Sequence, residues 1–149
     1  MQKHLKKIAR LVPVLDIKKT RVDAEAVALA AILREKVKLE SELMAWQQKY
    51  LNGVTRLNAE RESVERPMLL ALEAAVDHAR ETLFVFFQRL KEADLAEQAQ
   101  VMRVNIVQRE LSAVEKLQET HRERFKKEIS RNEQKGHDDI ALRRFLNSR

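Results

Sequence analysis

The chain has 149 residues, with two glycines, two prolines, no cysteine and a formal net charge of +6. So few turn-forming residues exclude sheets and α/β folds, which need a turn about every ten residues, and the absence of cysteine excludes disulfides and thiolate metal sites. The remaining residues are mainly strong helix formers, so we predict an all-α protein of long helices.

The first residues, 1–10, are basic, but Asp16, Lys18 and Lys19 interrupt the apolar residues that follow. No apolar run of signal-peptide length is therefore present. No later stretch approaches the roughly 20 apolar residues that are needed to cross a bilayer. We predict a cytoplasmic protein. Pro13 is predicted to lie in the first turn of the first helix, where its missing N–H is tolerated.

Apolar residues recur every seven positions from Leu15 to Leu57, with a companion row that includes Leu39. This heptad seam predicts a first helix over about 14–62. Proline disfavours helical geometry in the residue before it but is accepted in the first turn of a new helix. Pro67 therefore places a hinge at about 63–67.

A second heptad seam begins at Leu69 and continues to Phe125. It predicts a second helix over about 68–132. Gly136 is a candidate C-terminal stop, because helices commonly end at glycine. Asp138 or Asp139 would then cap a short tail helix within residues 133–149.

Folding at the hinge makes residues whose numbers sum to about 130 face one another. The expected fold is therefore one elongated antiparallel two-helix coiled coil over 1–149, with the second helix overhanging beyond about Lys116. Two parallel chains would satisfy the same heptads. Three of the aromatic residues, Phe84, Phe86 and Phe87, cannot all point inward, so at least one is expected to be exposed. The expected facing sets are Trp46 and Tyr50 with Phe84, Phe86 and Phe87, and Lys36 with Asp94 and Glu97.

Charge is unevenly distributed along the chain. Residues 1–21 carry a net charge of +6 and residues 116–149 carry +4, whereas residues 22–115 carry −4. A hairpin would bring both basic segments to one pole. Such a pole is suited to docking into an acidic opening or along an acidic surface, with steering that salt weakens.

Catalytic and metal-binding patterns are absent from the sequence. The chain has no phosphate-binding glycine motif, and no two of its four histidines, His4, His78, His121 and His137, lie at ligand spacing on one helix. Carboxylates on a solvated helix also lack a pocket that would shift their pKa. We therefore predict no enzymatic activity, no metal and no cofactor.

A family resemblance extends over the whole chain. Leu11, Val14 and Leu15 lead into residues 17–21 and then into alanine-rich heptads, with a hinge near the middle and a charged tail over 126–128, 133–135, 138–139 and 143–144. In these features the chain resembles the FliJ/YscO family, the central-stalk proteins of bacterial type III export systems, flagellar or injectisome.

The resemblance implies a monomeric hairpin like the stalk of a rotary ATPase, whose terminal pole enters the hexameric export ATPase. It also implies contacts with the cytoplasmic domain of the export gate and with export chaperones, and a location peripheral to the inner membrane through the export apparatus. The residues expected to contact the ATPase or gate are chosen by charge and location, and they are Lys18, Lys19, Arg21, Arg122, Arg124, Lys126 and Lys127.

Two other functions fit the same residues. A homodimeric coiled-coil scaffold or chaperone-type interaction protein would use the apolar seam, and it would differ from the stalk in being a dimer. A nucleic-acid binder would grip phosphates with the basic pole, with an affinity that falls steeply with salt. The sequence has no RGG tract and no zinc finger to support nucleic-acid binding.

Overall fold

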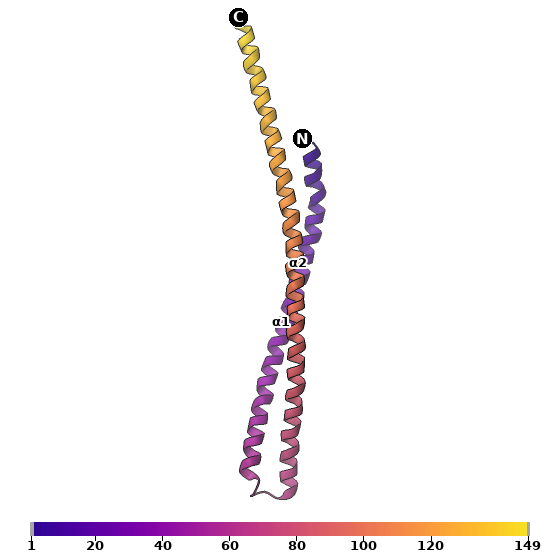
Figure 1. The fold of residues 1–149 in the computed structure, drawn as a ribbon, viewed down its shortest axis with the longest axis vertical. Helices are drawn as coiled ribbons and strands as arrows, with labels where there is room; N and C mark the ends of the chain where they lie inside the picture. Colours follow the sequence, from indigo (N-terminus) through magenta and orange to yellow (C-terminus); the bar gives the residue numbers. More distant parts are fainter. Residues whose placement is uncertain (1, 149) are drawn as a thin grey trace. The chain divides into compact units, whose positions relative to one another are not determined.

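The computed structural model describes residues 2–148 and contains two helices, α1 (Gln2–Glu60) and α2 (Arg66–Asn147). The helices are antiparallel and joined by a short turn (Figure 1). No strand occurs among residues 2–148. The predicted all-α fold of two long helices that pack against each other is confirmed.

The chain divides into two compact units, and both helices contribute to each. The first unit consists of residues 1–24 and 104–149, and the second unit consists of residues 25–103. Each is a pair of helical segments around its own apolar seam.

The core of the second unit is a cluster of four buried side chains, Leu39, Leu43, Leu83 and Phe86. Partly buried residues pack against this cluster, and they are Trp46, Tyr50, Leu90 and Ala93. Burying such apolar side chains is the main stabilising contribution to a helix pair. The expected approach of Trp46 and Tyr50 to Phe86 is confirmed.

Polar side chains also meet across the seam of the second unit. The Lys36 Nζ atom lies 2.7 Å from Asp94 Oδ1 and 2.8 Å from Glu97 Oε2. These hydrogen bonds, first to Asp94 and then to Glu97, raise the pKa of Lys36 above its ordinary value. The predicted facing of Lys36 with the two acids is confirmed.

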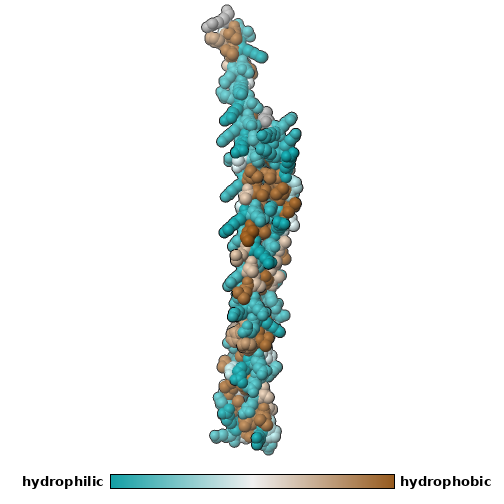
Figure 2. All heavy atoms as spheres, turned by 45° about the vertical axis from the view of Figure 1, so that its right-hand side comes forward, coloured by the Kyte–Doolittle hydropathy of each residue, from teal (hydrophilic) through white to brown (hydrophobic). Residues whose placement is uncertain are grey.

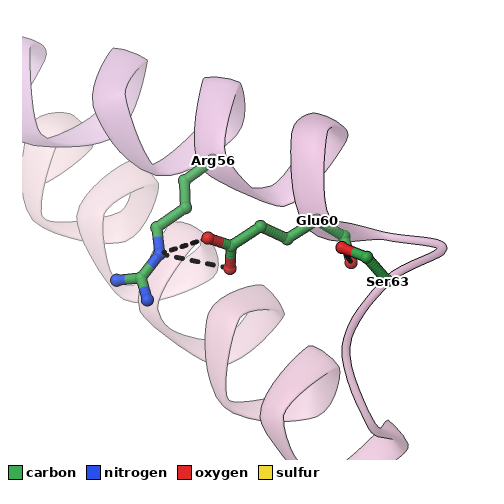
Figure 3. Close-up of polar contacts among 3 residues, drawn as sticks. All are labelled: Arg56, Glu60 and Ser63. Carbon is green, nitrogen blue, oxygen red and sulfur yellow. Dashed lines mark hydrogen bonds and ion pairs between the residues drawn. The ribbon is translucent and has the colours of Figure 1, made fainter.

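The turn between the helices occupies residues 61–65. The amides of Ser63 and Val64 both donate to the Glu60 carbonyl at 3.1 Å, which closes the end of α1. Arg56 Nε donates to the Glu60 carboxylate at 3.3 and 3.4 Å, and Ser63 Oγ donates to the Glu60 carbonyl (Figure 3). Pro67 lies in the first turn of α2, where no intrahelical N–H bond is needed.

The start of α1 differs from the prediction. The helix begins at Gln2 rather than at about residue 14, and Pro13 lies inside it. An internal proline removes one backbone hydrogen bond, but Ile8 and Leu11 keep the spacing of the seam on which Leu15 is buried. Packing therefore outweighs the local cost of the proline, and α1 accompanies α2 beyond Lys116.

The end of α2 also differs from the prediction. The helix continues to Asn147, so residues 133–147 belong to it and form no separate tail helix. Gly136 does not stop the helix. A glycine stop adopts a left-handed backbone conformation with a positive φ, and no glycine in the described chain has one. Its neighbours are helix formers, and Gln134 Nε2 donates to Asp138 Oδ1 at 3.3 Å within the helix. Residues 130–148 are all exposed, so the overhang of α2 begins near residue 130.

Many apolar side chains remain on the surface, where Figure 2 shows them among hydrophilic ones. Phe84 is 64% exposed and Phe87 is 50% exposed, while Phe86 is buried. This confirms that the three phenylalanines cannot all face the seam. Within residues 2–148, no helix has a stretch long and apolar enough to span a membrane.

Candidate docking surface

The first unit carries most of the positive charge of the protein. Its residues include 18 Lys or Arg and 10 Asp or Glu, a net charge of +8, whereas the second unit has 11 and 13, a net charge of −2. All seven cations predicted as partner contacts belong to the first unit. A surface of this kind binds through charge, so the placement of each cation decides what it can contact.

Lys18 differs from the other six cations because it is engaged within the first unit. It is half-buried, and its Nζ donates to Glu110 Oε2 at 2.9 Å. This hydrogen bond and the charge of Lys18, with a smaller contribution from Arg21, hold the pKa of Glu110 below its ordinary value. Lys18 therefore joins α1 to α2, while the other six cations are exposed.

Three of the exposed cations lie on one side of the seam, among acids. A groove there is lined by Lys19, Lys116 and Arg122 together with Glu115 and Glu119. Positions three and four residues apart share a helix face, so Lys126 extends this side on α2, and Asp16 and Asp23 extend it on α1. We call this side the mixed face, and its charged members are Lys19, Lys116, Arg122, Lys126, Asp16, Asp23, Glu115 and Glu119.

The other side of the seam is almost entirely basic. Lys7 and Arg124 lie close enough to His121, and Arg21 close enough to Glu110, for their charges to lower the pKa of these groups. The helical period places these three cations on the side of the seam opposite the groove. The same helical rows contain three further cations. We call this side the basic face, and its cations are Lys3, Lys7, Arg10, Arg21, Arg124 and Lys127.

The prediction treated the seven cations as one pole, but the structure separates them. Arg21, Arg124 and Lys127 lie on the basic face, and Lys19, Arg122 and Lys126 lie on the mixed face. Sequence reasoning missed the basic members before residue 14, because the first helix was predicted to start there. The spacing of His4, Ile8, Leu11 and Leu15, which continues the seam toward the N-terminus, is the signal that could have found them.

Two histidines meet in the seam of the first unit. The ring centroids of His4 and His121 lie 6.0 Å apart, and His4 Nε2 lies 3.0 Å from Glu128 Oε1. His121 is 7% exposed, and its burial, followed by the charges of Lys7, Arg124 and His4, lowers its pKa. Within residues 2–148, no group of three His, Cys, Asp or Glu side chains is placed to hold a metal ion.

Comparison with known proteins gives one match. The family model described as "Flagellar FliJ protein" matches residues 6–149, which is nearly the whole chain. No curated protein and no solved structure matches the chain. The match includes both helices and the basic segments of the first unit, and it is to the flagellar branch, which the sequence pattern left undecided. The chain belongs to the FliJ family of flagellar export proteins.

Proposed function

We propose that this chain is a non-enzymatic stalk of the flagellar type III export apparatus, whose first unit docks into the hexameric export ATPase. In this role it also contacts the cytoplasmic domain of the export gate and the export chaperones, at the cytoplasmic side of the membrane. The observation that carries the proposal is the net charge of +8 on the first unit, with 18 cations against 10 acids. An acidic ring would attract such a unit over several ångströms, with a strength that salt reduces.

The test measures the steady-state activity of the cognate export ATPase and its oligomeric state, with and without this protein. The variant combines Arg122→Glu, Arg124→Glu and Lys126→Glu. All three side chains are exposed in the first unit, so helicity and melting should be almost unchanged. We expect the wild type to stimulate the ATPase and promote its hexamer, and the variant to lose both effects.

A matched control reverses three exposed cations of the second unit, Arg34→Glu, Lys38→Glu and Lys91→Glu. This variant makes the same change in net charge, and we expect it to stimulate the ATPase as the wild type does. An equal loss in both variants would show that only the total charge matters. No stimulation by the wild type would contradict docking to the ATPase.

A further inference from the structure

The basic face of the first unit surrounds a patch of apolar side chains. Val14 and Ile17 on α1 belong to the same helical row as Arg10 and Arg21, and they are 37% and 59% exposed. Leu117 on α2 belongs to the row of Arg124 and is 47% exposed. Apolar side chains also reach the surface among charged ones in Figure 2. The basic face thus combines apolar residues at its centre with cations around them.

Negative charge is almost absent from this face. Its six cations are accompanied by one acid, Glu110, which already accepts a hydrogen bond from Lys18 at 2.9 Å. The mixed face has four cations and four acids. The two sides of one helix pair therefore differ by about five charges, and solvation of a coiled coil does not require such a difference.

We propose that the basic face binds the surface of an anionic phospholipid membrane. Lys and Arg extend their apolar stems along a membrane while their charged ends stay at the headgroups. Aliphatic residues between the cations then enter the boundary with the acyl chains, as in membrane-surface helices with a basic polar face. Val14, Ile17 and Leu117 are the residues that would enter.

The composition of the face favours lipid over an acidic protein. Centres of protein interfaces are enriched in aromatic residues and arginine and depleted of lysine. The rows that form the basic face contain no aromatic residue and include three lysines, Lys3, Lys7 and Lys127. The α1 row from residue 3 to residue 21 extends about 27 Å at 1.5 Å per residue, so its cations would meet many headgroups at once.

Vesicle co-sedimentation of the full chain tests the proposal without the ATPase. The wild type is expected to bind vesicles of phosphatidylcholine mixed with phosphatidylglycerol and not vesicles of phosphatidylcholine alone. The basic-face variant, Arg10→Glu, Arg124→Glu and Lys127→Glu, should bind the anionic vesicles about one hundredfold more weakly and with a lower dependence on salt.

The matched control is the mixed-face variant, Lys19→Glu, Arg122→Glu and Lys126→Glu. It makes the same change in net charge at exposed positions, and we expect a much smaller loss of vesicle binding. Equal losses in the two variants would show attraction by net charge alone and would overturn the assignment to one face. No binding of the wild type to anionic vesicles would also overturn it, and would leave an acidic protein as the occupant.

A second variant tests the apolar centre of the face. Ile17→Ser with Leu117→Ser should weaken binding to anionic vesicles while leaving its dependence on salt unchanged, since the cations remain. Both side chains are exposed, so the melting temperature should hold. Unchanged binding would contradict insertion of these residues. Loss of vesicle binding by the variant Ile17→Ser with Leu117→Ser, together with normal ATPase stimulation by the same variant, would separate this inference from the proposed function.

Discussion

At the scale of single residues, the environment of His121 opposes its charge. His121 lies in the seam of the first unit beside His4, and Lys7, Arg124 and Glu128 are the other charged groups around the two rings. Burial costs the protonated imidazole its hydration, and neighbouring positive charges add to that cost. The folded state therefore disfavours a proton that the unfolded chain accepts readily.

The free energy of unfolding of the first unit should consequently decrease as the pH decreases. The pKa of His121 is below its ordinary 6.5 in the folded state, so the unfolded chain binds the proton first. The contribution is fully present above about pH 6.5 and is lost as the pH falls below it. When thermal melting is measured at several pH values, the melting temperature should decrease less with decreasing pH in His121→Gln than in the wild type.

The control for this measurement is His4→Gln, because the His4 ring lies 6.0 Å from the His121 ring and would be disturbed by the same substitution. If His121→Gln and the wild type lose stability in parallel below pH 6.5, protonation of His121 is not the cause. A retained difference in the His4→Gln background would assign the effect to His121 itself.

At the scale of elements, the two helices, their antiparallel pairing and the turn between them could be predicted from the sequence. Heptads report directly which residues face a partner, and Pro67 restricts where a new helix begins. The helix ends could not be predicted in this way. Pro13 and Gly136 are both residues that often bound helices, but tertiary packing around Leu15 and the helix formers around Gly136 outweigh that local preference.

Gly136 should accordingly be a site where alanine stabilises α2. A Cβ atom at this position would meet no atom within 4 Å, so the substitution creates no clash. Gly136→Ala should favour the local helix by about 1 kcal/mol. Hydrogen exchange of the amides over residues 131–147 should become slower, and unchanged exchange would contradict a helical Gly136.

Gly53 provides the comparison for that substitution. A Cβ atom there would lie 3.1 Å from Val76 Cγ2, closer than ordinary van der Waals contact. Gly53→Ala should therefore gain less than Gly136→Ala, because Val76 must move to accept the methyl group. The close approach of Val76 is thus a packing reason for glycine at this helical position.

At the scale of the whole molecule, the sequence correctly assigned the positive charge to the two terminal segments. It could not separate the basic face from the mixed face, because the pairing of residues 2–13 with α2 depends on a helical segment that the heptad pattern did not predict. Lys18 also looked like a free contact residue, whereas it is hydrogen-bonded to Glu110. A count of charges along the sequence does not reveal which charged side chains pair across the seam.

The stalk hypothesis also predicts the mass of the particle in solution. In each unit the two helical segments cover one another's seam, so a second chain is not needed to bury it. Sedimentation equilibrium should give the 17.4 kDa of one chain. A stable dimer would contradict the monomeric stalk and favour the scaffold hypothesis.

The polar contacts across the seam also determine the register of the helix pairs. An aliphatic seam alone allows one helix to slip by a heptad along the other with little loss of burial. In the second unit such a slip would separate Lys36 from its acids, and it would separate the Gln100 amide from the Glu25 carbonyl that accepts its hydrogen bond at 3.0 Å. The slipped alignments would leave these groups without hydrogen-bond partners, which is costly. A polar residue in the core of other coiled coils specifies their register in the same way. The second unit is therefore selective among alignments that its leucines alone would not distinguish.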